Sequence, residues 1–292
     1  MKTSGFKKLI LLLLTACVLA ACVSGCTTKV GDETPAAATV IPTDIPSPDT
    51  TPDNSDGTAA PATDITVTGP LAGIVICVDA GHQNKALSDK EECAPWGPEA
   101  NAKVNNTVMK AKATAGTVGV ATGATEYQVN LEIALKLEAA LKAQGATVIM
   151  VRSDNESSIS NKERALMANE AHCEVTFNIH CNGAESESAN GTELYVRGAG
   201  DNTAEYSARS AKDYALGVKL LDRITTSAGS KKRNVNKSDA YTGINWRDHT
   251  TFIVECGFMS NPDEDRLLST PEYQDKIVAG IVTFMLEDYT NE

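Results

Sequence analysis

The sequence predicts an α/β fold: a single domain in which a twisted, mostly parallel sheet is flanked by helices on both faces. Two observations lead to this prediction. From residue 71 to residue 292, apolar runs of strand length alternate with longer segments of helical periodicity, and this order is typical of parallel strands joined by crossover helices. Most helical segments also begin at recognisable cap residues, which separates them from the strands.

The expected strands are short runs of apolar and β-branched residues. The first covers residues 74–79 and leads into an Asp-Ala-Gly turn followed by a histidine. The others are expected at residues 146–152, 174–182, 191–198 and 250–255. Because helical segments separate most of these runs, they are expected to join one sheet through crossover connections.

The expected helices follow cap residues. Thr125 and Gln128 form a capping box before an apolar stripe at residues 129–141, and Gly145 ends this helix. The other helix signals are a capping box of Ser160 and Glu163 with a helix to about Ala171, the periodicity of residues 208–224, and the pairs Asn261-Pro262 and Thr270-Pro271.

One segment, residues 83–124, interrupts this alternation. It is rich in Ala, Lys, Asn, Thr and Gly and has weak periodicity. A structureless segment of this length is either functional or disordered. Since it follows His82 directly and ends just before Glu126, we expect a lid or a groove wall rather than slack chain.

The first 70 residues are not expected to fold with the domain. Residues 1–26 resemble a lipoprotein-type signal peptide, with a short basic start and an apolar run too short to span a membrane comfortably. Cys26 is the preferred lipidation site because polar sequence follows it, and Cys22 is the alternative. Residues 27–70, rich in Thr, Pro and Asp, are expected to form a disordered tether. We therefore expect an extracytoplasmic protein that is anchored to the bacterial cell membrane by its lipid.

Composition excludes some partners. The formal net charge is −12, which argues against nucleic acid as a partner. Five of the cysteines lie beyond residue 70, and their odd number and irregular spacing do not form a disulfide framework.

Four ionisable residues are expected at one edge of the sheet. His82 follows the first strand, His180 and Glu255 close two later strands, and Glu126 begins a helix. The carboxyl ends of parallel strands are where α/β proteins bind ligands. Two imidazoles and one carboxylate are a known zinc set that leaves the fourth position for water, and a second carboxylate is then available as a base. Taken singly, each residue is equally well explained as a polar strand end, so these residues alone leave both explanations open.

Four motifs carry a family resemblance. In order, "VDAGH", "ATEYQVN", "NIHCNGA" and "VECGFMSN" resemble the motifs of the zinc-dependent N-acetylmuramoyl-L-alanine amidases of the Amidase_3 type, over nearly all of residues 71–292. The resemblance implies that His82, Glu126 and His180 bind one Zn²⁺ and that Glu255 is the catalytic acid and base. It also implies that peptidoglycan is the substrate, cleaved between N-acetylmuramic acid and the L-alanine of the stem peptide.

Other residues are candidates for substrate contact. Asn182 belongs to the third motif, and Trp246 could stack on a sugar, although packing of the loops explains it equally well. Arg247 could pair with a stem-peptide carboxylate, but a surface charge is the simpler explanation. His249 is expected in a loop within reach of substrate. Two alternative functions remain: a zinc peptidase that cuts within the stem peptide, and a non-catalytic wall-binding lipoprotein.

Overall fold

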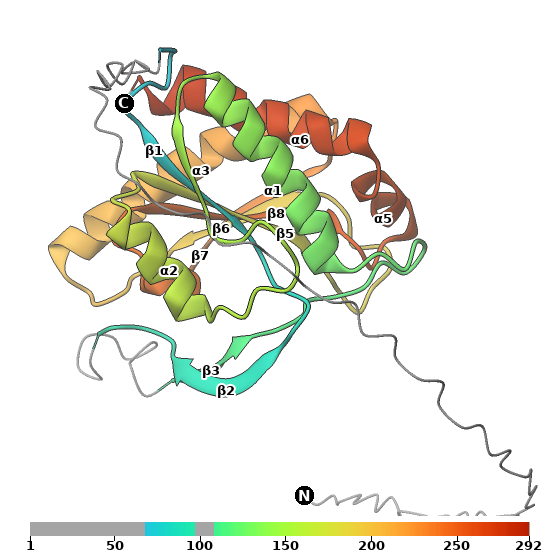
Figure 1. The fold of residues 1–292 in the computed structure, drawn as a ribbon, viewed down its shortest axis with the longest axis horizontal. Helices are drawn as coiled ribbons and strands as arrows, with labels where there is room; N and C mark the ends of the chain where they lie inside the picture. Colours follow the sequence, from blue (N-terminus) through green and yellow to red (C-terminus); the bar gives the residue numbers. More distant parts are fainter. Residues whose placement is uncertain (1–67, 97–107, 292) are drawn as a thin grey trace, which may run out of the picture. The chain divides into compact units, whose positions relative to one another are not determined.

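One sheet of six strands forms the centre of the computed structural model, which describes residues 68–96 and 108–291 (Figure 1). Its strand order is β4-β1-β5-β8-β6-β7. Neighbouring strands are parallel except for β6 and β8, which confirms the mostly parallel sheet. The strands are β1 (Val75–Ala80), β4 (Thr147–Met150), β5 (Val175–Asn182), β6 (Thr192–Arg197), β7 (Lys232–Ser238) and β8 (Thr250–Phe258).

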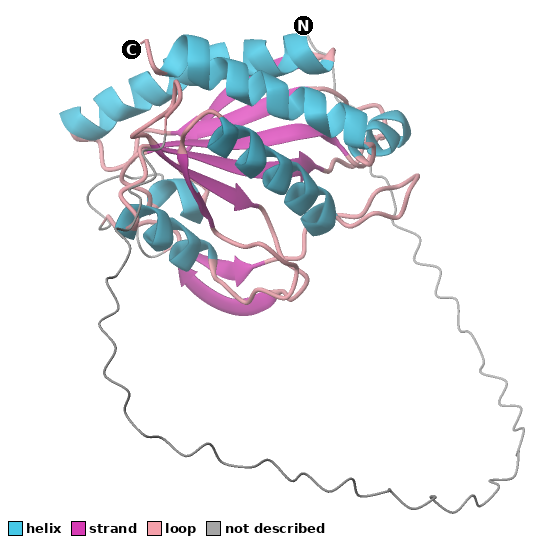
Figure 2. Ribbon diagram, turned by 45° about the horizontal axis from the view of Figure 1, so that its top comes forward, coloured by secondary structure: helices cyan, strands magenta, loops and turns pink. Residues whose placement is uncertain are grey.

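Helices cover both faces of this sheet (Figure 2). The long helices α1 (Glu126–Ala143), α3 (Ala204–Ala228) and α6 (Pro271–Phe284) pack together on one face. The shorter α2 (Asn161–Glu170) and α4 (Thr242–Asn245) contact each other on the opposite face. Helix α5 (Pro262–Leu268) follows β8, and the π-helical turn η1 (Met285–Tyr289) continues α6.

Strand β5 separates the two faces by simple alternation, because successive strand side chains point to opposite sides. Its odd-numbered residues, such as Phe177, are buried in the large apolar core. There Phe177 stacks on Phe252 with ring centroids 5.9 Å apart, and Phe284 of α6 packs edge-on against both rings. The even-numbered residues are Thr, Asn, His and Asn, and they face the side of α2 and α4.

The capping predictions are confirmed at three helices and wrong at one. Ser160 and Glu163 form the expected capping box of α2. Asn261 and Thr270 cap α5 and α6 ahead of their prolines. Thr125 is the N-cap residue of α1, but its side chain makes no cap hydrogen bond. Gln128 instead donates to Glu132 in the next turn, so the capping box expected there is not formed.

The structure adds elements that the hydrophobic pattern did not predict. Strand β7 is polar in sequence, and it lies at the edge of the sheet, where no apolar pattern is required. Helix α3 begins before the expected residue 208 because Thr203 accepts from the backbone N–H of Tyr206 and caps it.

The segment between β1 and α1 contains regular structure. Strands β2 (Leu87–Glu92) and β3 (Met109–Ala113) form an antiparallel pair, so the expectation of a structureless segment is wrong for these residues. Their polar sequences, which include alternating Lys and Ala in β3, explain why no buried strand was recognised.

Several predictions fall outside the described residues. The signal peptide, both candidate lipidation cysteines and nearly all of the tether lie within residues 1–67, which the structure does not describe. Among the residues that it does describe, no helix combines the length and apolar character needed to cross a membrane. The five cysteines of this part are buried and unpaired.

Candidate active site

The carboxyl ends of β1, β5 and β8 bring three of the predicted residues to one edge. These strands are neighbours in the sheet, and His180 of β5 lies in register with Glu255 of β8. On the other side of β5, the backbone N–H of Gly81 donates to the carbonyl of Ile179 at 2.8 Å. His82 is therefore held one residue beyond the last β1–β5 bond.

His82, Glu126 and His180 form a cluster able to hold a metal ion. Oε1 of Glu126 lies 3.1 Å from Nε2 of His82 and 3.1 Å from Nδ1 of His180, and one ligand atom from each residue lies within 4.8 Å of the others. Nδ1 of His82 is 3.0 Å from the carbonyl oxygen of Thr114. The hydroxyl of Thr114 lies 2.9 Å from the same nitrogen, so Thr114 orients the ring while Nε2 faces Glu126.

Two glycines leave room for these side chains. A Cβ on Gly81 would lie 2.3 Å from the ring of His180. A Cβ on Gly116 would lie 2.5 Å from Oε2 of Glu126. His82 itself has φ 63°, a left-handed conformation that is costly for a residue with a side chain and is found preferentially at functional sites.

Glu126 is buried at the start of α1, where the positive end of the helix favours an anion. Oε2 accepts from the backbone N–H of Thr117 at 2.9 Å. Burial opposes ionisation, but hydrogen bonds and charge interactions with His180 and His82 outweigh it, so the pKa of Glu126 is lowered. Burial in turn lowers the pKa of His180. A carboxylate beside an imidazole whose protonation is disfavoured suits metal binding, which needs deprotonated ligands.

Glu255 lies next to this cluster but has a different environment. Its Oε2 is buried without a hydrogen-bond partner. Burial raises the pKa of Glu255 well above its usual value, and the nearby negative charges of Glu126 and Glu193 raise it further. A carboxyl group with a raised pKa can hold a proton at neutral pH and return to the anion, as a general acid and base requires.

A cavity of about 210 Å³ opens beside the cluster on the α2 and α4 side of the sheet. A shallower depression shares His82 and Thr114 with it and extends past Glu126 to Gly183 and Ser260. The two hollows therefore adjoin at the candidate metal site, where both are lined by His82 and Thr114. The cavity is lined by Asp79, His82, Thr114, Asn161, Arg164, Asn178, His180, Tyr241, Thr242, Gly243, Ile253 and Glu255.

Buried ion pairs fix the turn that carries His82. Asp79 contacts Nη1 of Arg164 at 2.6 Å and Nη2 of Arg247 at 2.7 Å. Burial opposes its ionisation, but these two guanidinium groups lower its pKa to about 2. Arg164 also donates to the carbonyls of Ala80 and His82, each at 2.9 Å. The turn is thereby held by a residue of α2.

The comparisons with known proteins agree with this site. A family model described as N-acetylmuramoyl-L-alanine amidase, Amidase_3, matches residues 76–287. The chain belongs to this amidase family. That places it among the peptidoglycan hydrolases of the cell wall, consistent with the expected resemblance.

Individual relatives match different shares of their length. The N-acetylmuramoyl-L-alanine amidase LytC of Bacillus subtilis is 31% identical over 166 residues, covering 57% of this chain and 31% of LytC. The germination-specific amidase of the same organism is 25% identical over 224 residues, covering 70% and 88%. The matched part thus spans under a third of LytC. The structure of the amidase Ami1 from Mycobacterium smegmatis has a TM-score of 0.62 at 23% identity, covering 74% of this chain and 98% of Ami1, and this supports the fold.

Within this member of the amidase family, the three residues predicted to contact substrate lie outside the lining of the cavity. Nδ2 of Asn182 donates to Glu193 at 2.9 Å. The indole of Trp246 donates to the carbonyl of Glu92, and Lys162 lies over its ring. Arg247 is buried against Asp79, so the alternative that it is a surface charge is wrong.

His249 lies at the other end of β5, because its Nε2 contacts the hydroxyl of Thr176 at 2.6 Å. The expectation that it lies within reach of substrate is therefore wrong. Conversely, Thr114, Tyr241 and Gly243 line the cavity and were not predicted. They belong to polar segments without an apolar pattern, which gave no signal in the sequence.

Proposed function

We propose that this chain hydrolyses the amide between the lactyl group of N-acetylmuramic acid and the L-alanine of the stem peptide, with one zinc ion held by His82, Glu126 and His180. The observation that carries the proposal is the convergence of these three ligand side chains, two of which line one cavity together with Glu255, in a chain of the amidase family.

The donor set fits zinc. Two imidazole nitrogens and one carboxylate oxygen are zinc ligands that leave a position open for catalysis, and Nε2 of His82 lies 3.1 Å from the carboxylate of Glu126. Bound there, zinc would supply Lewis-acid polarisation of the amide carbonyl and a lowered pKa for water.

Glu255 moves the proton in this proposal. Its carboxylate accepts a proton from the water that adds to the amide carbon. The resulting carboxylic acid gives this proton to the alanine nitrogen as the C–N bond breaks. The products are a lactyl carboxylic acid and a free amine, and the acid then loses its proton to give the carboxylate. Burial and the charges of Glu126 and Glu193 support this double role because they stabilise the protonated form.

The proposal extends to the location of the domain. We infer that residues 1–26 direct export, that Cys26 or alternatively Cys22 is lipidated, and that residues 27–70 tether a catalytic domain of residues 71–292 to the membrane. Labelled fatty acid should enter the protein in cells and be lost in Cys26→Ser. Loss only in Cys22→Ser would move the site, and no label in the unmodified protein would refute the anchor.

Mass spectrometry of digested peptidoglycan tests the reaction. Purified protein should release stem peptides with a free L-alanine amino terminus and leave the glycan strands intact, whereas Glu255→Gln should release almost none. New termini within the stem would instead indicate the peptidase. Absence of products with the zinc-loaded protein would refute catalysis and favour the wall-binding alternative.

A further inference from the structure

Arg247 is a buried cation with unused hydrogen-bond donors. Only 2% of the residue is exposed, and Nη2 donates to Asp79 at 2.7 Å. Nε and Nη1 are buried, and neither has a hydrogen-bond partner among the residues that the structure describes. Buried polar groups are nearly always hydrogen-bonded, and unmet donors of a charged group are especially costly. A ligand that supplies an acceptor for Nη1 would remove part of this cost.

Gly243 opens the cavity toward this guanidinium. It lines the cavity as part of α4, and a Cβ placed on it would lie 3.4 Å from Nη1 of Arg247 and 3.8 Å from Nδ2 of Asn178. Asn178 also lines the cavity, and its Oδ1 is buried without a partner. Because residue 243 has no side chain, Nη1 of Arg247 and the amide of Asn178 lie directly behind this part of the cavity wall.

The charge beneath the cavity favours an anion. The single carboxylate of Asp79 is shared by Arg164 and Arg247. Arg152 is also close enough that burial and the charge of Arg164 lower its pKa to about 10. Arg152 is influenced by both Asp79 and Asp154, so three guanidinium groups stand against two carboxylates here, and the remaining positive charge favours a negative ligand group.

The distance fits the residue that follows L-alanine in the stem peptide. Asn178 precedes His180 by two positions on β5, so it lies roughly 7 Å deeper along the strand. An extended peptide places the next residue at a comparable distance of roughly 4–7 Å from the scissile nitrogen. In peptidoglycan that residue is a D-glutamyl unit whose α-carboxyl group is either free or amidated.

We propose that Arg247 and Asn178, reached past Gly243, bind the free α-carboxylate of this second stem residue, so that the enzyme prefers acidic stems to amidated ones. This inference rests on the proposed amidase function. Arg247 Nη1 donates to the carboxylate, and the side-chain amide of Asn178 donates through Nδ2. An amidated stem replaces the charge-assisted contact with a weaker neutral one.

The test compares two substrates that differ in this group. Glycan strands carrying stem peptides with a free or an amidated second residue are digested with the zinc-loaded protein, and kcat/KM is measured for each. The native enzyme should favour the acidic stem about tenfold, the size expected for one hydrogen bond to a charged group.

Gly243→Ala should remove this preference and leave the fold intact. Its methyl group would sit at ordinary contact distance from the guanidinium, in a short helix that tolerates alanine. We expect kcat/KM for the acidic stem to fall about tenfold, with little change for the amidated stem. Asn178→Asp, which supplies an internal carboxylate for Arg247, should have the same selective effect.

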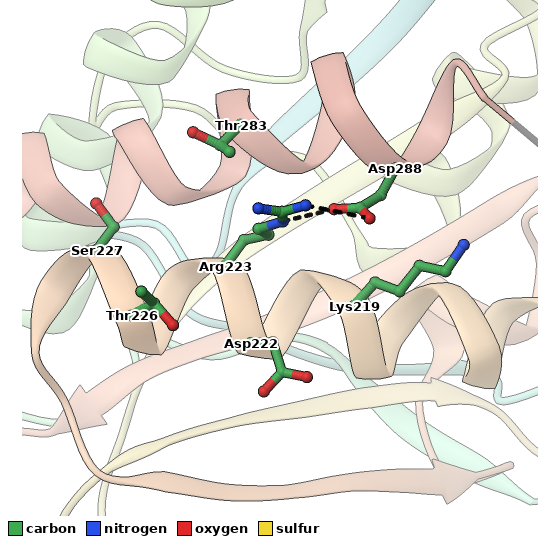
Figure 3. Close-up of a pocket in the computed structure, with 7 residues that line it drawn as sticks. All are labelled: Lys219, Asp222, Arg223, Thr226, Ser227, Thr283 and Asp288. Atoms are coloured by element: carbon green, nitrogen blue, oxygen red, sulfur yellow. Dashed lines mark hydrogen bonds and ion pairs between the residues drawn. The ribbon is translucent and has the colours of Figure 1, made fainter.

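A second pocket provides a matched control. It lies between α3 and the end of α6 (Figure 3), where Nε of Arg223 contacts Asp288 at 2.7 Å and Nη1 contacts Glu287 at 2.8 Å. Thr226 is exposed there, so Thr226→Ala should retain the native preference and unfolding temperature.

The possible failures are distinguishable. If neither stem is cleaved, the amidase function fails and this inference fails with it. If both stems are cleaved equally by the native enzyme, the amidase function stands and the carboxylate site is refuted. An undiminished preference in Gly243→Ala and Asn178→Asp, with both variants folded by circular dichroism, would also overturn the assignment.

Discussion

The two faces of the central sheet are built from the same strands but have opposite character. On one face, Phe177, Phe252 and Phe284 pack in a wholly apolar core. On the other face, the next residue of β5 is Asn178, which is also buried but keeps an unpartnered oxygen. Burial is thus common to both faces, while the side chains that β5 buries are apolar on one face and polar on the other.

The apolar face of the sheet stabilises the fold, whereas the polar face carries the groups proposed to react or to bind substrate. The apolar face gains free energy from every contact, because burial removes hydrocarbon from water. The polar face holds unmet groups at Asn178, Arg247 and Glu255, and each lowers the stability of the fold. Such groups persist where a ligand or a reaction uses them.

The largest expected effect is on the polar face. Glu255→Gln should reduce the rate of amide hydrolysis roughly 10²–10⁴-fold, because glutamine cannot accept and return the proton. Zinc content and unfolding temperature should be retained. Steady-state rates with metal analysis provide the measurement, and full activity or loss of zinc in this variant would contradict the role proposed for Glu255.

A substitution on the apolar face should lower the stability and leave the rate of hydrolysis nearly unchanged. Phe177→Ala should lower the free energy of unfolding by about 3–5 kcal/mol, through lost burial and the cavity left behind. The rate per folded molecule should change little, since Phe177 points away from the groove. Denaturant titration and the rate below the unfolding midpoint test this. If Phe177→Ala left the stability unchanged and strongly reduced the rate, the assignment of stability to one face and catalysis to the other would be refuted.

Removal of the metal should lower both the catalytic activity and the stability of the fold. A chelator should abolish activity and lower the unfolding temperature, and zinc should restore both. Zinc at 100 times its Kd contributes about 2.7 kcal/mol to the folded state. His180→Ala should lose this dependence, whereas Phe177→Ala should keep it. Scanning calorimetry with and without zinc measures the change in unfolding temperature. Full activity in chelator would refute the metal site.

The smallest expected effect is a pH dependence at His249. Burial lowers its pKa from 6.5 to about 4, opposed by its hydrogen bond to Asp248. The unfolded chain therefore binds more protons between these values, so His249 costs no stability above about pH 6.5 and destabilises the fold as the pH falls toward 4. The loss should be about 1–3 kcal/mol. His249→Gln should flatten this part of a stability–pH curve, and an unchanged curve would contradict it.

The sequence predicted the elements that follow strong local rules. His82, His180 and Glu255 were predicted to meet because the ends of parallel strands share one edge, and the structure brings the first two together with Glu126. The proline-capped helices were predicted from two adjacent residues each.

What was missed depends on contacts between distant parts of the chain. Arg164 and Asp79 are 85 positions apart, and neither residue alone indicates a buried pair. Trp246 and Arg247 are adjacent, yet one lies near the β2–β3 hairpin and the other beneath the cavity. The short helix α4 has no hydrophobic period, so its contribution to the cavity wall could not be predicted.

The turn before His82 makes the site dependent on the whole domain. Its three carbonyls accept hydrogen bonds from Asn130 of α1, from Arg152 after β4 and from Arg164 of α2. A designer who transplanted the "VDAGH" peptide into another scaffold would carry over the histidine without the three side chains that aim it. The unit that can be moved between proteins is therefore the sheet with its two flanking helices, and not the motif.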